Sequence, residues 1–428
     1  MHSTRRTRSG ALMAAASLLA VTGCLAERPP DDGIPGGGGP GVPAGASKAE
    51  YIDAFEDVAP IHLTTQIPSS PGDLNTLHLV EYAEALHEWS GGTITLDIAW
   101  GNAVADPDDA PLALSDGRLD LDMVYPVYEP SRYPANGAAL AATGFLGQQD
   151  PVAGSLQAAG GYLEVLMDDT EFMTETEEEG YKLLLPWAPA SSSGLLCNRP
   201  LTGLDDLRGA QVRVGGSAFA RQAEALGMTP VSMPYSEIYQ GLQRGTLDCV
   251  LQSRWAAVSL GLVPLAPNYT VHADTGFARL HYGVGFGLAQ WEELPLVAQQ
   301  LVYDRLDVYI GEMYEQAIWG GMALAAEQEP GTGGEVAELA PDAREALEEI
   351  NAQLREEARA ESGVDAALTE EVEAALDRWR GIVVDELGYA EVAEDEFPDW
   401  YEQQGAQVDT DPFVDRLVAE VLDRHRPE

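Results

Sequence analysis

Apolar positions follow two different periods along residues 61–274. Short apolar or alternating runs, typical of β-strands, are separated by segments with an apolar residue every three or four positions, typical of helices. The predicted strands are 61–66, 93–100, 120–125, 183–187, 194–198, 210–214, 230–233 and 246–252, and the predicted helices are 74–90, 111–117, 204–207, 218–226 and 236–244. This strand–helix–strand order predicts an α/β protein with mostly parallel sheets covered by helices.

The strands and helices fall into two blocks without an internal sequence repeat, which predicts two α/β lobes. Ligands in open α/β folds bind beyond the carboxyl ends of strands, so we expect a cleft between the lobes. The rest of the chain is predicted to be helical, with one long helix over 293–326 and two acidic amphipathic helices over 340–360 and 369–387.

The N-terminus has the pattern of a bacterial lipoprotein signal. Three arginines lie within residues 5–8, a short apolar run covers 11–22, and Val21-Thr22-Gly23-Cys24 resembles a lipobox. We expect residues 1–24 to be the signal peptide and Cys24 to carry the lipid that anchors the protein. The alternative is a plain secretory signal with an incidental cysteine.

Residues 25–50 contain a run of four glycines, several prolines and few large apolar side chains. This composition cannot build a core and predicts a flexible tether, with the folded part beginning near Tyr51. No later segment is long and apolar enough to suggest a transmembrane helix.

The formal charge of −46, from 70 acidic and 24 basic residues, argues against nucleic acid as a partner because nucleic acid is a polyanion. Adaptation to high salt and a lineage bias in composition explain the acidity equally well. Catalytic and metal-binding motifs are missing: the sequence has no nucleophile elbow, phosphate-binding loop, paired zinc histidines or calcium loop. We therefore expect a protein that is not an enzyme and that has no cofactor and no metal.

One candidate for ligand binding is Arg213, which lies in the apolar predicted strand 210–214 just before Gly215 and Gly216. A guanidinium at the carboxyl end of a strand can hold a carboxylate with two parallel hydrogen bonds. The residues alone leave a second interpretation open, in which Arg213 pairs with a nearby Asp at the surface.

The surrounding segment, 201–255, carries many residues at a fixed spacing. They are Asp206, Leu207, Gly209, Arg213 and Val214, followed by Leu226, Gly227, Pro230, Val231, Met233, Pro234, Tyr235, Ser236, Glu237, Tyr239, Leu242, Gln243, Gly245 and Asp248. This set closely resembles the substrate-binding subunits of tripartite ATP-independent periplasmic (TRAP) transporters, and weaker similarity extends over about 58–400.

The resemblance implies a two-lobed periplasmic-binding-protein-like fold with crossing hinge strands and a long C-terminal helical region. It places lobe I at 51–190, completed by about 268–315, and lobe II at 191–267, completed by about 316–400. A C-terminal helical tail follows at 401–428.

By the same resemblance, Arg213 is the carboxylate clamp, Tyr235 packs on the ligand and Gln252 bonds to it. Four further aromatic residues could line the cleft or be buried packing: Trp187, Tyr125, Tyr128 and Trp255. Ser193 stands nearest to the position where the family often has a second arginine. The loss of that charge favours a monocarboxylate, or a zwitterion balanced by an acidic side chain, over a dicarboxylate.

Cys197 and Cys249 are the only cysteines of the folded part. The family's sheet order implies that their strands are neighbours, so we expect the two residues to lie close together, either as a disulfide or as two thiols.

The predicted function is capture of a small organic acid outside the cytoplasm for the membrane permease subunits of a TRAP transporter, by a lipid-anchored protein that is a monomer or a dimer. The alternatives are a ligand-sensing lipoprotein receptor and, less favoured, a lipoprotein enzyme on the same scaffold.

Overall fold

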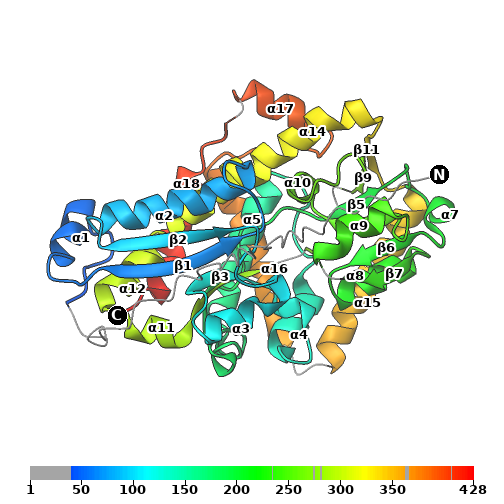
Figure 1. Ribbon diagram of the computed structural model, residues 1–428. Helices are drawn as coiled ribbons and strands as arrows, with labels where there is room; N and C mark the ends of the chain where they lie inside the picture. Colours follow the sequence, from blue (N-terminus) through cyan, green and yellow to red (C-terminus); the bar gives the residue numbers. More distant parts are fainter. Residues whose placement is uncertain (1–39, 234, 273–274, 280–281, 362–365, 406) are drawn as a thin grey trace, which may run out of the picture. The chain divides into compact units, whose positions relative to one another are not determined.

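The computed structural model describes residues 40–428 with the exception of 234, 273–274, 280–281, 362–365 and 406 (Figure 1). The predicted signal peptide, Cys24 and the predicted tether up to residue 39 lie outside the described residues.

The first lobe is built on two small sheets. β1 (Ile61–Ile67) and β2 (Ile94–Trp100) pair in parallel, and β10 (Gly283–Gly287) lies between β3 (Leu121–Val124) and β4 (Tyr181–Leu185) in antiparallel pairing. The backbone N–H of Asp120 donates to the carbonyl of Thr64, 2.8 Å away, and so joins β3 to β1. Helix α2 (Leu77–Trp89), preceded by the 3₁₀ turn η1 (Leu74–Thr76), runs along the β1–β2 pair (Figure 1).

The second lobe contains one six-stranded sheet in the order β11–β9–β5–β8–β6–β7. Its strands are β5 (Gly194–Cys197), β6 (Gln211–Val214), β7 (Thr229–Ser232), β8 (Cys249–Gln252), β9 (Asn268–Val271) and β11 (Val336–Glu338). β6 is parallel to both β7 and β8, so the carboxyl ends of these three strands lie at one edge. β9 pairs with β5 and β11, so the return to the first lobe, expected at about residue 268, begins only after this strand.

The remaining helices connect and cover these sheets. They are α1 (Lys48–Ala54), α3 (Ala110–Ser115), α4 (Pro134–Thr143), α5 (Ala153–Leu166), α6 (Thr170–Thr174), α7 (Leu204–Leu207), α8 (Ser217–Ala225), α9 (Ile238–Gln243), α10 (Arg254–Ser259), α11 (Leu288–Glu293), α12 (Leu296–Asp304), α13 (Leu306–Glu312), α14 (Gly321–Thr332), α15 (Pro341–Glu361), α16 (Ala366–Arg380), α17 (Phe397–Gln403) and α18 (Asp411–Glu420).

The fold begins earlier in the chain than the composition suggested. Val42 and Ala46 are buried, and Ser47 and Glu50 form a capping box at the start of α1. The backbone N–H of Val42 donates to Gln300, and its carbonyl accepts from Arg426 near the C-terminus. The prediction of a free tether up to residue 50 was therefore wrong for residues 42–50, because two small apolar side chains and a cap suffice to hold this segment.

The predicted long helix over 293–326 is divided into several pieces. α12 ends before Arg305, whose guanidinium lies 3.7 Å from the ring centre of Trp89, and a π-helical segment η6 (Met313–Gly320) separates α13 from α14. In η6, Tyr314 and Trp319 donate hydrogen bonds to the carbonyls of Ser155 and Pro151, respectively. These two hydrogen bonds explain why the chain changes from α-helix to π-helix here, a change that the spacing of apolar residues does not reveal.

The two acidic amphipathic helices were predicted correctly in position. α15 contacts α8 of the second lobe and also α4, while α16 lies alongside α5 and continues into the π-helical segment η7 (Gly381–Glu386). Within the described part of the chain, no helix combines the length and the apolar character that crossing a bilayer requires.

Cys197 and Cys249 face each other in the β5–β8 pairing and are joined by a disulfide. The bond closes a loop with a sequence separation of 52 residues and thereby limits the conformations of the unfolded chain.

We predict that removal of this disulfide, by reductant or in a Cys197→Ala/Cys249→Ala variant, lowers the free energy of unfolding by about 4 kcal/mol, the value for a loop of this length. The measurement is chemical denaturation of a Cys24→Ser form with and without reductant. Alkylation of the denatured, unreduced protein should label neither cysteine. Two labelled thiols before reduction would contradict the bond.

Candidate ligand-binding site

Arg213 is the third residue of β6 and points from the carboxyl end of this strand. Its residue surface is 2% exposed, and its Nε donates to the carbonyl of Met233 at 3.2 Å. Nη1 is buried and has no hydrogen-bond partner among the described residues, and none of these residues forms an ion pair with Arg213. A buried cation with unused donors is unfavourable unless an anion completes it.

Arg213 lines a cavity, which we call the arginine cavity, together with Tyr128, residues 215–217, Ser232, Met233 and Tyr235. Residues 216–217 begin helix α8, whose N-terminal partial charge adds to that of the guanidinium. The acidic residue in the lining is the exposed Asp108, which does not pair with Arg213 within 4 Å. The cavity therefore favours an anionic group.

Tyr128 in the lining of the arginine cavity stacks on Tyr125, which lines a neighbouring cavity. Their rings are stacked with centres 5.2 Å apart, and Arg213 lies 5.6 Å from the ring centre of Tyr128. Burial raises the pKa of Tyr128, and the nearby charge of Arg213 opposes this rise. Burial also raises the pKa of Tyr235, which lines both cavities, so the two phenols are neutral at physiological pH.

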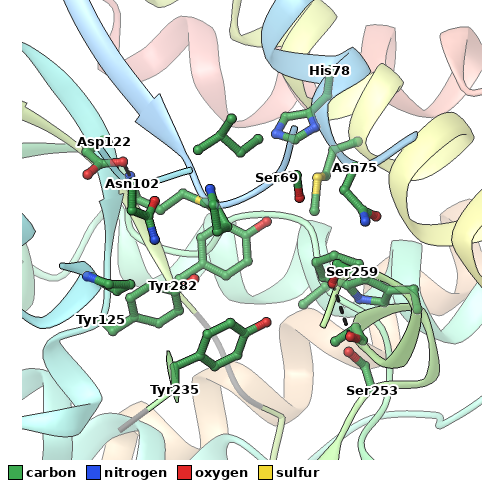
Figure 2. Close-up of a pocket in the computed structure, with 18 of the residues that line it drawn as sticks. Ser69, Asn75, His78, Asn102, Asp122, Tyr125, Tyr235, Ser253, Ser259 and Tyr282 are labelled. Atoms are coloured by element: carbon green, nitrogen blue, oxygen red, sulfur yellow. Dashed lines mark hydrogen bonds between the residues drawn. The ribbon is translucent and has the colours of Figure 1, made fainter. Parts of the chain in front are cut away.

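The neighbouring cavity, which we call the aromatic cavity, is lined from both lobes (Figure 2). Tyr125 and Asn102 follow the carboxyl ends of β3 and β2, whereas Gln252 and Trp255 come from β8 and α10 of the second lobe. Tyr282, just before β10, completes the aromatic wall and lies beside Tyr125, at a distance of 5.7 Å between ring centres. The carboxyl ends of strands from both lobes thus meet at one site.

Three polar atoms of residues that line the aromatic cavity have no hydrogen-bond partner within the described structure: Oδ1 of Asn75, Nδ1 of His78 and Nε1 of Trp255. Asn75 and His78 belong to η1 and α2, and Figure 2 shows them with Ser69 on the same side of the cavity. Burial lowers the pKa of His78 to about 3, so its ring is neutral. Buried polar atoms usually have hydrogen-bond partners, so these three atoms are available to a bound molecule or to water.

Asp122 lines the aromatic cavity from β3 and is 5% exposed. Its Oδ1 accepts from the N–H of Met123 at 2.8 Å, and its Oδ2 accepts from Nε2 of Gln66 at 2.9 Å. Burial raises the pKa of Asp122 to about 8, and the two hydrogen bonds only partly oppose this effect. No cation forms an ion pair with Asp122 among the residues placed by the structure.

The lining of the aromatic cavity includes no lysine or arginine. The cationic side chain of the site is therefore that of Arg213, which lines the adjoining arginine cavity. The two other buried arginines of the described chain, Arg254 and Arg279, do not line these cavities, although Nε of Arg279 also has no hydrogen-bond partner in the described structure. Arg254 forms ion pairs with Glu329 and Glu394, and Arg279 donates to the carbonyls of Leu146 and Gln148. These two arginines stabilise the fold instead of facing the cavities.

Six of the eight predicted ligand-binding residues line the two cavities. They are Arg213, Tyr128 and Tyr235 in the arginine cavity and Tyr125, Tyr235, Gln252 and Trp255 in the aromatic cavity, with Tyr235 common to both. Trp187 is fully buried and stacks on Tyr162 with ring centres 3.8 Å apart, so it is core packing. Ser193 lines a third cavity, with Gln149 and Glu394, and not the cavities next to Arg213.

The sequence interpretation missed Asp122, Asn75, His78 and Tyr282 as cavity residues. An acidic residue between Leu121 and Met123 of an apolar strand was the available signal, but the sequence analysis did not use it. Asn75 and His78 have no local signal, because their role depends on how η1 and α2 are placed. In the portion of the chain that the structure describes, no group of three or more His, Cys, Asp or Glu could hold a metal ion.

Comparison with known proteins identifies the family. The family model described as bacterial extracellular solute-binding protein, family 7, matches residues 67–361. A solute-binding protein of Albidiferax ferrireducens is 20% identical over 253 residues, which are 58% of this chain and 72% of that protein. The ectoine-binding periplasmic protein TeaA of Halomonas elongata is 28% identical over 131 residues, covering 30% of this chain and 37% of TeaA.

Solved structures share the fold at low sequence identity. A marine metagenome TRAP solute-binding protein specific for pyroglutamate has a TM-score of 0.62 and 16% identity, over 75% of this chain and 99% of that one. The ectoine-binding protein of the Halomonas elongata TeaABC TRAP transporter has a TM-score of 0.62, with 20% identity and coverages of 74% and 99%. A Bordetella bronchiseptica TRAP protein with bound mandelate has a TM-score of 0.62, with 20% identity and coverages of 76% and 100%.

The predicted family and the two-lobed α/β fold are therefore confirmed, and this chain belongs to bacterial extracellular solute-binding protein family 7, with the fold of TRAP solute-binding proteins.

Proposed function

We propose that this protein captures a small organic acid outside the cytoplasm, by binding its carboxylate at Arg213, and delivers it to the membrane permease subunits of a TRAP transporter. The family consists of solute-binding proteins, which supports transport over catalysis. Tyr235 and Gln252 would contact the bound solute, together with Tyr125, Tyr128 and Trp255.

The observation that carries this proposal is the buried guanidinium of Arg213. It lines a cavity, keeps Nη1 without a hydrogen-bond partner in the described structure, and stands beside the N-terminus of α8. A carboxylate that accepts two hydrogen bonds from this side chain would satisfy the donor and neutralise the charge.

The number of cations limits the class of solute. Arg213 is the one Lys or Arg in the lining of the two cavities, both of which consist of described residues. A second carboxylate would have no cationic partner, so a monocarboxylate or a zwitterion is favoured over a dicarboxylate. Similar proteins are described as specific for pyroglutamate and as binding ectoine and mandelate, each of which carries one carboxylate.

The lipobox-like residues 21–24 support attachment of the protein to the membrane through lipid on Cys24. Residues 25–41 would then act as the tether, since the fold begins at Val42. We propose that the protein is a monomer with two lobes and a C-terminal helical tail.

We predict that Arg213→Ala weakens binding of an organic acid about 30-fold or more, because the buried charge partner of the carboxylate is lost. The measurement is the rise in melting temperature of the purified protein with sodium salts of small carboxylic acids, since a ligand of the folded state stabilises it. Arg213→Lys should bind more weakly than wild type, because it keeps the charge but loses the planar pair of donors.

Arg208→Ala is the matched control, because this guanidinium lies just before β6 and its side chain is 73% exposed. It should keep the full thermal shift. An undiminished shift in Arg213→Ala would remove Arg213 from the site and with it the basis of the proposed function.

We also predict that Cys24→Ser abolishes incorporation of labelled fatty acid in bacteria and moves the protein from the membrane fraction to the soluble fraction. Mass spectrometry of the N-terminal peptide checks the attachment. Retention of the variant in the membrane fraction would contradict a lipid anchor at this residue.

A further inference from the structure

The two cavities hold buried groups of opposite charge at different places. Arg213 lines the arginine cavity from the second lobe, and Asp122 lines the aromatic cavity from the first lobe. Neither forms an ion pair with a residue that the structure describes. Tyr235 lines both cavities, so the two groups face adjoining spaces.

The hydrogen bonds of Asp122 suit an ionised carboxylate. Both of its oxygens accept from N–H donors, one from Met123 and one from Gln66, and Gln66 is itself fixed because its side-chain oxygen accepts from the backbone of Ala105 at 3.1 Å. An ionised carboxylate at 5% exposure is costly without a positive partner. The pocket thus holds the carboxylate in place without supplying the cation that would stabilise it.

The surroundings of Asp122 favour a cation over a neutral donor. Tyr125, Tyr235 and Tyr282 stand together in the aromatic cavity, below Asp122 and Asn102 in the view of Figure 2. Aromatic rings attract cations through the negative charge on their faces, most strongly where water is excluded. On the opposite side of the cavity, Oδ1 of Asn75 is an acceptor without a partner in the described structure.

We propose that the solute is a zwitterion, with its carboxylate on Arg213 and a cationic nitrogen group against Asp122 and the neighbouring tyrosine rings. This inference rests on the proposed function, because it takes the carboxylate site at Arg213 as given. It adds Asp122 as the residue that selects solutes carrying a positive charge.

Binding of such a solute is coupled to release of a proton. In the empty cavity the pKa of Asp122 is about 8, so most molecules carry a protonated Asp122 at pH 7. A bound cation favours the ionised form, and the proton leaves to solvent. Affinity therefore rises with pH, by about tenfold per unit below the pKa, and levels off above it.

His78 and four nearby tyrosines do not produce this effect. His78 from α2 lines the same cavity, and its lowered pKa of about 3 keeps it neutral between pH 6 and 9. Burial raises the pKa values of Tyr125, Tyr235, Tyr282 and Tyr309, so these phenols stay protonated over the same range.

The test compares matched solutes on the full-length protein with Cys24→Ser. L-Proline and L-pyroglutamate have the same five-membered ring and carboxylate, but only proline has a cationic nitrogen. A thermal-shift series with this pair, ectoine, glycine betaine and mandelate identifies the class that binds, and titration calorimetry of the best solute in buffers of different ionisation enthalpy counts the protons released. We expect zwitterions to give the largest shifts and to release about one proton at pH 7.

Asp122→Asn should weaken binding of the zwitterion about 30-fold or more and reduce proton release to about zero. Asp97→Asn is the control, since it removes the same charge from an exposed position on strand β2 of the same lobe and should leave both quantities unchanged. Asp122→Asn should also remove the pH dependence of affinity.

The outcomes separate this inference from the proposed function. If the largest shifts come from pyroglutamate or mandelate and depend on Arg213, the zwitterion is excluded while carboxylate capture stands. A zwitterion that binds equally well to Asp122→Asn and releases no proton also overturns the role of Asp122. If none of the carboxylates produces an Arg213-dependent shift, both proposals fall.

Discussion

The structure of this site depends on one buried guanidinium, that of Arg213, which forms no ion pair with a carboxylate of the described protein. Desolvation of a charged side chain costs several kcal/mol. A buried charge is therefore stable only where an opposite charge and hydrogen bonds offset this cost. In Arg254 this cost is offset within the protein, because its guanidinium forms ion pairs with Glu329 and Glu394. Arg213 lacks such partners in the described structure. It lines a cavity and its Nη1 has no hydrogen-bond partner there, which is the arrangement expected where a ligand brings the anion.

The rest of the fold places this side chain and the groups around it. Parallel pairing of β6 with β7 and β8 brings Arg213, Tyr235 and Gln252 to one edge of the second sheet. In the first lobe, β3 carries Asp122 and is followed directly by Tyr125, so these two residues lie at the edge of its sheet that contributes to the site. Because the two edges contribute to adjoining cavities, a solute that bridges them contacts both lobes, and binding energy can then favour a closed arrangement of the lobes.

Much of this site could be predicted because its signals are local in sequence. An arginine within an apolar strand, followed by two glycines, marks Arg213, and the family resemblance of 201–255 adds Tyr235 and Gln252. The residues that were missed or misplaced depend on tertiary structure. His78 reaches the cavity only through the position of α2, Trp187 is buried because Tyr162 covers it, and Val42 is held by contacts with Gln300 and Arg426 from distant parts of the chain.

The most direct test of the central claim is a crystal structure of the protein with the solute that remains bound through purification, identified by native mass spectrometry. The account predicts one carboxylate of this solute at about 3 Å from two nitrogens of Arg213, between Tyr128 and Tyr235. A solute whose carboxylate lies elsewhere, with Arg213 bonded only to protein, would contradict it.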